Sequence, residues 1–317
     1  MARSLTGTSW EQRTSRVPPH AYFVVSAVFH YLGPAFAVLL FARVDVLGVA
    51  WLRIASAAVV FAAWRRPWRA WGAFSRETRR TVVAWGGVLA VMNSCFYISI
   101  DRLPLSTVAA IEFIGPIGLA AVAVRSRRNA IALLLAGAGV YTLTGIRLVG
   151  EPIGFAFAFA NAALFTLYIV LGHRAAQRGA ASGIDALALS MLVAAAVATP
   201  LGIWDAGAAL LDPIALVAGA GVGISSSVIP YVSDQLALAR LPRATYALFV
   251  SLLPATATVV GIVVLNQVPG AQEIVGVSMV IAGVAVHQER AHAAANDLPL
   301  TTAEAAPDWV PQQATSP

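Results

Sequence analysis

Apolar residues run in blocks of roughly 17 to 25 along most of this chain of 317 residues, separated by short polar segments. A helix rises 1.5 Å per residue, so about 20 apolar residues cross a hydrocarbon core about 30 Å thick. The pattern therefore predicts an all-α membrane protein with ten transmembrane helices. We place them at residues 20–42, 46–64, 81–100, 105–124, 129–146, 152–173, 184–204, 213–236, 244–265 and 271–287.

An internal repeat divides these helices into two groups. The tripeptide Arg-Leu-Pro occurs at 102–104 and again at 240–242, which is an offset of 138 residues, and Pro116 matches Pro254 at the same offset. Each half holds five helices, an odd number, so the second half must enter the membrane from the opposite side. We expect two inverted five-helix repeats.

The repeats account for almost all of the chain. We expect four regions, which are a cytoplasmic N-terminal segment at 1–19, repeats at 20–146 and 152–287, and a cytoplasmic tail at 288–317. The tail is rich in Ala, Pro and acidic residues and has no apolar period, so we expect it to be disordered.

The distribution of the basic residues indicates how the chain is oriented in the membrane. All 21 basic residues are arginine; seventeen fall in segments that would face the cytoplasm and three in the outer loops. This bias satisfies the positive-inside rule with both termini cytoplasmic and predicts a multi-pass protein of the cell (inner) membrane. The net charge of +6 is explained by this topology, and we expect no nucleic-acid partner.

Several chemistries lack the residues they need. Cys95 is the only cysteine, the chain has no GxxxxGK[ST] phosphate loop, and no Ser-His-Asp order or paired carboxylates stand at catalytic spacing. His287 and His292 have no further metal ligands around them. We therefore expect a protein that is not an enzyme and that holds neither cofactor nor metal.

Three polar side chains fall at one depth of the predicted first repeat. Arg53 and Glu112 each lie about eight residues from the outer end of a span, or roughly 12 Å deep, and Asn93 reaches a similar level. A charged side chain near the bilayer centre costs about 2.5–3.5 kcal/mol, so each one needs a reason. Arg53 and Glu112 could form a static ion pair that holds the repeat together. Alternatively, Glu112 engages a proton or a substrate ammonium while Arg53 engages a carboxylate or tunes Glu112.

Five further polar residues are candidates for substrate or proton contacts. His30 is mid-span and titrates near neutral pH, and Tyr97 lies one turn beyond Asn93. Asn161, Tyr231 and Asp234 come from the second repeat. Each has a plainer interpretation: His30 as a satisfied buried group, the tyrosines as packing residues, and Asp234 as a solvated end of a helix. The serines at 225–227 are interpreted as packing hydroxyls that line a polar path.

Four prolines, Pro34, Pro116, Pro230 and Pro254, lie inside predicted spans. Each removes one backbone hydrogen bond and favours a kink. Structural kinks explain them, and hinges for alternating access are the second interpretation.

Several segments together resemble the threonine/homoserine exporters of the EamA branch of the drug/metabolite transporter superfamily. They are Met92 to Ile100, Leu103-Pro104-Leu105, Ala110 to Pro116, Leu52-Arg53, Tyr168, Gly172-His173-Arg174 and Pro230-Tyr231. The resemblance covers about residues 20–287. It implies a ten-helix inverted-repeat carrier of the inner membrane that exports small metabolites on a proton gradient.

The chain departs from that family at three places. Leu253 replaces a common glutamate, Leu265-Asn266-Gln267 replaces Leu-Gly-Glu, and Phe165 replaces a usual tryptophan. These changes leave the fold assignment intact and put the substrate in question.

We expect a proton-coupled secondary transporter that exports a small amino acid or related polar metabolite by alternating access. Its partners would be that solute, the proton and the bilayer, with monomer and homodimer both open. The alternative within transport is an exporter of a purine or cationic drug. A lipid-active enzyme or scramblase and a membrane scaffold are the other classes, and the sequence shows no lipid-facing polar groove or nucleophile–base pair for the former.

Overall fold

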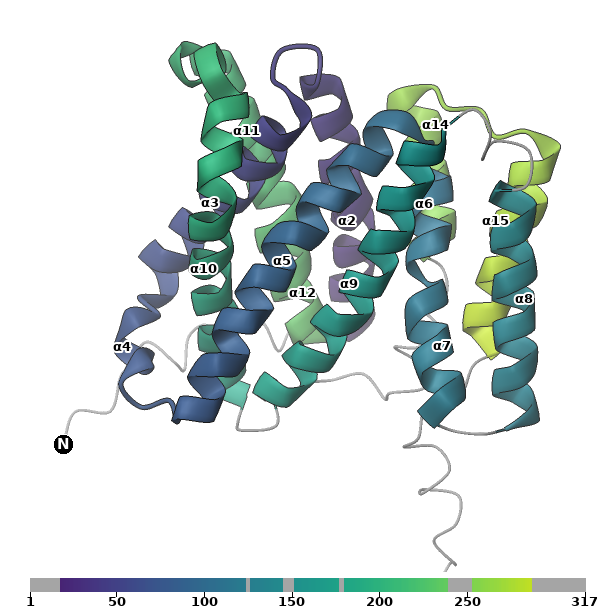
Figure 1. The fold of residues 1–317 in the computed structure, drawn as a ribbon, viewed down its shortest axis with the longest axis horizontal. Helices are drawn as coiled ribbons and strands as arrows, with labels where there is room; N and C mark the ends of the chain where they lie inside the picture. The colour runs from purple at the N-terminus through teal and green to yellow at the C-terminus, as the bar shows by residue number, and fades with distance from the viewer. Residues whose placement is uncertain (1–17, 124–125, 145–150, 177–179, 239–252, 287–317) are drawn as a thin grey trace, which may run out of the picture.

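The computed structural model describes residues 18–123, 126–144, 151–176, 180–238 and 253–286. Helices occupy most of these residues, and no strand occurs among them (Figure 1). In chain order they are α2 (Pro19–Leu40), α3 (Val46–Arg65), α4 (Trp68–Trp71), α5 (Arg76–Arg102), α6 (Leu105–Glu112), α7 (Ile114–Ala123), α8 (Arg127–Thr144), α9 (Pro152–Ala176), α10 (Ala180–Ala206), the 3-10 turn η1 (Gly207–Leu211), α11 (Pro213–Gly223), the π-helical turn η2 (Ile224–Val228), α12 (Ile229–Leu238), α14 (Leu253–Leu265) and α15 (Ala271–Val286).

Six of these helical stretches are long and apolar enough to cross a membrane, and shorter apolar helices accompany them. Outward-facing apolar side chains are broadly exposed; Val59, Leu134, Val217 and Val263 each expose 67–73% of their surface. Exposed apolar surface on this scale marks a face that meets lipid or another protein. The all-α membrane fold is thus confirmed, whereas the count of ten spans stays a prediction.

Short-range chemistry explains where several helices begin and end. Ser75 caps α5 by accepting the Thr78 N–H at 3.2 Å, and Asp212 caps α11 by accepting the Ile214 N–H at 2.9 Å. The last turn of α5 is followed by Leu103 in an extended conformation. That conformation is expected for a residue before a proline, here Pro104.

Two spans that the sequence predicts as single units are interrupted in the structure. The fourth is divided at Phe113 into α6 and α7, and the eighth contains the π-turn η2 between α11 and α12. Pro116 cannot donate to the Glu112 carbonyl, nor Pro230 to the Ser226 carbonyl four residues earlier, so helical hydrogen bonding fails at both places. Both interruptions thus lie beside prolines at which the sequence predicts kinks, whereas α2 continues unbroken through Pro34.

Helices from opposite sides of residue 151 pack in pairs. α3 packs on α10, α5 on α9, α2 on α12, and α8 on α15 (Figure 1). The half-helix α6 packs chiefly on α14 and α9, although α5 and α7 are its neighbours in sequence. The two halves of the chain therefore interlock along their length rather than forming separate bundles.

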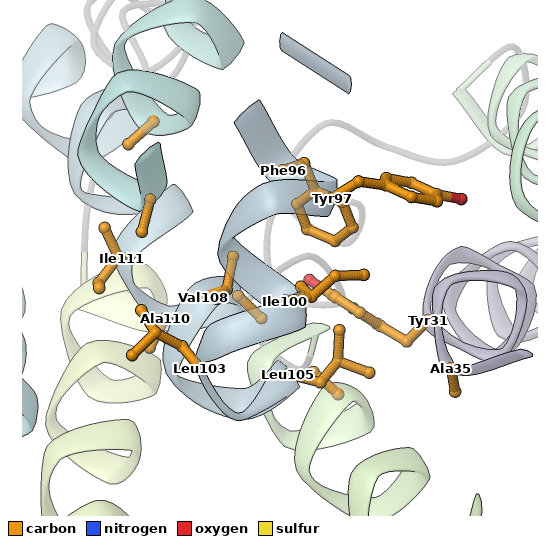
Figure 2. Close-up of a cluster of buried hydrophobic side chains, with 14 of the residues drawn as sticks. Tyr31, Ala35, Phe96, Tyr97, Ile100, Leu103, Leu105, Val108, Ala110 and Ile111 are labelled. Atoms are coloured by element: carbon orange, nitrogen blue, oxygen red, sulfur yellow. The ribbon is translucent and has the colours of Figure 1, made fainter. Parts of the chain in front are cut away.

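The interior holds two apolar clusters. One joins α2, α5, α6 and α14, and the other joins α3, α5, α9 and α10. In the first cluster the Tyr31 side chain extends from α2 toward Val108 of α6, and Tyr97 extends from α5 (Figure 2). Both tyrosines are fully buried, so their hydroxyl groups stand inside an otherwise apolar core.

Several predicted features lie outside the described residues. These are the N-terminal segment up to residue 17, the second Arg-Leu-Pro copy at 240–242, the first part of the ninth span up to residue 252, and the tail from residue 287 onward.

Candidate functional site

Glu112 is a buried carboxylate at the point where the fourth span breaks. It is the last residue of α6, and only 5% of its surface is exposed. Asn161 of α9 donates its Nδ2–H to the Glu112 Oε1 at 3.1 Å. The second carboxylate oxygen makes no hydrogen bond with the described residues. Glu112 is therefore a buried acid at the break, with one carboxylate oxygen bonded to the second half of the chain and the other without a hydrogen bond to the described residues.

A close approach between α7 and α9 holds this geometry. Gly115 lies against the Ala162 carbonyl and the Thr166 hydroxyl, so that a Cβ at this position would stand 2.8 Å from the former and collide with the latter. The Phe113 and Phe165 rings meet edge-on at 6.5 Å. Any side chain at residue 115 would push α7 away from α9 and move Glu112 relative to Asn161.

Arg53 is the buried cation of the candidate site, with 5% of its surface exposed. It lies on α3 and reaches the π-turn of the eighth span. Its Nε–H donates to the Ser227 hydroxyl and its Nη2 to the Ser226 carbonyl, both at 3.0 Å. The guanidinium also lies over the Tyr97 ring at 5.5 Å, within the range of a cation–π contact.

Pro230 explains why the Ser226 carbonyl is free to accept the arginine. A proline has no N–H, so the regular helical donor to Ser226 is missing. Gly33 of α2 packs so closely on Ser226 that a Cβ there would overlap its backbone and side chain. The freed carbonyl is thus surrounded by α2 and α3, and the arginine satisfies it in a place that water would reach with difficulty.

Arg53 and Glu112 do not form the ion pair that the sequence allowed. Within the described part of the chain, the salt bridges join Arg43 to Asp212 at 3.6 Å and Arg65 to Asp185 at 2.9 Å. Arg53 remains within electrostatic reach of Glu112. Polar groups of the second half stabilise both charges instead: Ser226 and Ser227 bond to Arg53, and Asn161 bonds to Glu112.

Several buried polar atoms around these charges lack partners. Among the described residues, the Tyr31 hydroxyl and the Asn161 Oδ1 find no hydrogen-bond partner, and Tyr31 is within electrostatic reach of Glu112. The Tyr97 hydroxyl also makes no hydrogen bond of standard geometry in the described part of the chain, although Arg53 and Ser226 are near it. A buried polar group without a partner costs about 1–3 kcal/mol. These atoms are the ones that a bound polar solute or water would satisfy.

The other predicted residues differ in how closely they join this group. Asn93 donates to the Leu89 carbonyl of its own helix at 2.7 Å, and its exposed fraction is only 3%. His30 meets the Tyr31 ring edge-on at 5.3 Å and is within electrostatic reach of Arg53. Tyr231 stacks on Tyr168 at 6.4 Å. The Asp234 side chain lies outside what the structure describes.

Sequence reasoning missed Ser226, Ser227 and Tyr31 as members of the candidate site. The serines were interpreted as packing hydroxyls, and Tyr31 was not singled out. One signal was present, since Ser226 and Glu112 each stand four residues before an intramembrane proline, as does His30 before Pro34. That spacing marks a backbone carbonyl that has lost its helical donor.

The arrangement is suited to a small solute that carries both donors and acceptors. The unpartnered oxygens of Glu112 and Asn161 would accept hydrogen bonds from an ammonium, and the Glu112 carboxylate could instead take up a proton. The C-terminal end of the half-helix α6 adds partial negative charge at the same place.

The known proteins to which this chain is similar are membrane transporters. The profile of the EamA-like transporter family matches residues 152–287. The threonine/homoserine exporter RhtA of Escherichia coli (strain K12) is 33% identical over 241 residues, which cover 74% of this chain and 79% of the exporter. The protein of the same name in Salmonella typhimurium (strain LT2) is 33% identical over 256 residues, covering 79% of this chain and 84% of that protein.

A solved crystal structure shares the fold at low sequence identity. It aligns with a TM-score of 0.56 and 18% identity, over 85% of this chain and 97% of its own. At that identity the likeness concerns the arrangement of helices alone.

Proposed function

Because the chain belongs to the EamA-like transporter family, we propose that it is a secondary transporter that exports a small amino acid or related polar metabolite across the inner membrane. The names of the relatives, which are threonine/homoserine exporters, make L-threonine and L-homoserine the first solutes to test. The many apolar helices support a multi-pass membrane protein.

The proposed architecture is ten helices in two inverted repeats with both termini in the cytoplasm. Three observations support it. The arginines are biased toward one side, the Arg-Leu-Pro motif recurs after 138 residues, and helices pair reciprocally across residue 151. In that pairing the first helix of one half packs on the third of the other, and the third on the first, as a twofold relation would require.

In the proposed mechanism Glu112 exchanges a proton for the ammonium group of the solute during alternating access. One observation supports this role of Glu112. One of its carboxylate oxygens accepts a hydrogen bond from Asn161, and the other has no protein partner among the described residues. Arg53 would stabilise the site from a fixed position, because two of its nitrogens are already engaged by Ser226 and Ser227. Proton coupling then requires that solute and proton compete for the same carboxylate.

Counterflow in proteoliposomes tests the proposal. Vesicles preloaded with L-threonine should accumulate labelled L-threonine, and a pH gradient should drive net transport. Glu112→Gln removes the charge at nearly constant volume. A hydrogen bond to a charged group contributes about 1.5–3 kcal/mol, so we expect transport at low substrate to fall roughly 10–100-fold. We also expect its pH dependence to flatten.

Asp101→Asn is the matched control, because Asp101 is an exposed acid near the junction of α5 and α6. It should leave transport within about twofold of the unmodified protein, in line with the small effects of surface substitutions. Unchanged transport and pH dependence in a normally folded Glu112→Gln protein would refute the role of Glu112. Absence of counterflow with L-threonine, L-homoserine and other small amino acids would refute the substrate class.

The second candidate is export of a planar or cationic compound such as a purine or drug. An aromatic group favours it, in which Tyr168 lies 5.5 Å from Trp85 and stacks on Phe165 at 6.1 Å and on Tyr231 at 6.4 Å. Aromatic faces attract flat rings and cations. Counterflow of labelled adenine or of a labelled organic cation, in the absence of amino-acid counterflow, would favour this alternative.

A further inference from the structure

The half-helix α6 belongs to the first half by sequence but is held at both ends by the second half. At its start, the Leu105 N–H donates to the Gln267 Oε1 at 3.1 Å, and at its end Glu112 accepts from Asn161. All eight residues of α6 are buried. Its main packing partners are α14 and α9, which also come from the second half.

The start of α6 lacks a cap of its own. Pro104 occupies the N-cap position and makes no side-chain hydrogen bond there. Ser, Thr, Asp and Asn are the usual residues at this position because their side-chain oxygens accept an orphan N–H. Gln267 supplies such an oxygen from across the structure, so the N-terminus of α6 depends on a residue 162 positions later in the chain.

A tight turn aims Gln267 at this end of α6. Asn266 follows α14 with φ of 54°, the left-handed conformation that asparagine accepts more readily than most residues. The Gln267 N–H then donates to the Gly261 carbonyl at 3.0 Å. The backbone of Gln267 is therefore anchored to α14, and its side chain is presented from a fixed point.

We propose that Gln267 is a positioning residue that sets the place of Glu112 along the axis of α6. The seven residue steps from Leu105 to Glu112 form a rigid segment about 10 Å long, so a shift at one end reaches the other. This role rests on the proposed function of Glu112. It predicts that Gln267 affects solute recognition without touching the solute.

Three variants test the proposal in proteoliposomes with L-threonine as the probe. Gln267→Ala removes the acceptor, and we expect the KM of transport to rise about fivefold, the effect of a lost helix cap, with little change in maximal rate. Gln267→Glu keeps an acceptor at a helix N-terminus, where a negative charge is favourable, so it should restore the KM to within about twofold.

Gln272→Ala is the matched control. Gln272 donates its Nε2–H to the Thr142 carbonyl at 2.8 Å, which also ties the two halves together, but this hydrogen bond goes to α8 and not to α6. It should leave the KM unchanged. An equal KM in the Gln267→Ala and Gln272→Ala proteins would overturn the proposal, as would a failure of Gln267→Glu to restore it.

A double-mutant cycle with Glu112→Asp separates positioning from general stability. The shorter side chain already displaces the carboxylate, so Gln267→Ala should raise the KM by less than twofold in that background, whereas independent sites would show the full, additive effect. Additive effects would overturn the positioning role and leave the proposed function standing. Normal transport by Glu112→Gln would instead refute the proposed function itself.

Discussion

The two buried charges of the first half are held in contrasting ways. Arg53 donates two hydrogen bonds to the π-turn and lies over the Tyr97 ring, so two of its three nitrogens and one face of the guanidinium are engaged by protein. Glu112 accepts one hydrogen bond from Asn161, and its other carboxylate oxygen makes no hydrogen bond with the described residues. A group that is already satisfied gains little from a ligand, whereas an open one gains a great deal. The contrast supports the proposal that Arg53 is an anchor and that Glu112 is the exchanging group.

The same contrast changes the interpretation of the polar layer. Three groups at a common depth suggested one cluster around the solute. In the structure Asn93 bonds within its own helix, Arg53 bonds to a distorted turn, and Glu112 faces α9. Depth alone thus does not distinguish a binding group from a structural one.

The largest expected effect is that of replacing Arg53 on the free energy of unfolding. Arg53→Met leaves the Ser226 carbonyl and the Ser227 hydroxyl buried without this donor. At about 1–3 kcal/mol for each unsatisfied group, we expect a loss of about 3 kcal/mol in the free energy of unfolding. Denaturation of the detergent-solubilised protein measures this loss.

Arg65→Met is the matched control, because Arg65 pairs with Asp185 at side chains that are 30% and 21% exposed. Partly exposed pairs contribute about 1 kcal/mol or less, so its stability should change little. A stable Arg53→Met protein that has lost transport would reverse the comparison and make Arg53 a direct contact of the solute.

An intermediate effect is expected beside Glu112, on the affinity for the solute. Asn161→Leu removes the donor to Glu112 and the unpartnered Oδ1 together, and we expect a roughly tenfold loss of L-threonine affinity, corresponding to about 1.4 kcal/mol. Asn93→Leu is the control, since within the described residues the Asn93 amide donates to the Leu89 carbonyl of its own helix rather than to Glu112. Thermal stabilisation by L-threonine, which rises with the ratio of ligand concentration to Kd, compares the two. Equal losses of L-threonine affinity in the two variants would show that Asn161 contributes no more to solute binding than Asn93.

The smallest effect extends the comparison to two tryptophans. The Trp51 Nε1–H donates to the Thr199 hydroxyl at 2.9 Å, whereas the buried Trp85 Nε1–H makes no hydrogen bond with any residue that the structure describes. Trp51→Phe should cost about 1 kcal/mol more in stability than Trp85→Phe, because only the former loses a hydrogen bond. Thermal unfolding of the two proteins measures the difference. An equal or larger cost at Trp85 would mean that its N–H is satisfied in solution.

Much of the fold could be predicted because the bilayer restricts what a chain can do. An apolar run that crosses lipid must satisfy its backbone internally, so helices follow from composition and length. The breaks were within reach as well. Pro116 and Pro230 lose a donor wherever they occur in a helix, and both interruptions lie beside them. Glu112 and Arg53 could be singled out because ionisable groups are costly in a membrane.

The partners of those charges could not be predicted in the same way. Asn161 is 49 residues from Glu112, and Ser226 is 173 residues from Arg53. Nothing in the local pattern indicates which buried polar groups will meet, since packing of whole helices decides it. The apparent match of Arg53 with Glu112 was reasonable by depth and charge. It was wrong because α3 faces the π-turn and α6 faces α9.

The sequence by itself determined that this protein is helical, where its apolar spans lie, where prolines weaken them and which charges are exceptional. These features depend on local composition and on the cost of placing polar groups in lipid. Only the tertiary structure decided that α6 is held by Gln267 and Asn161, that Arg53 bonds to Ser226 and Ser227, and that one oxygen of Glu112 makes no hydrogen bond with the described residues. Those outcomes depend on contacts between residues far apart in the chain, which form only when the two halves interlock.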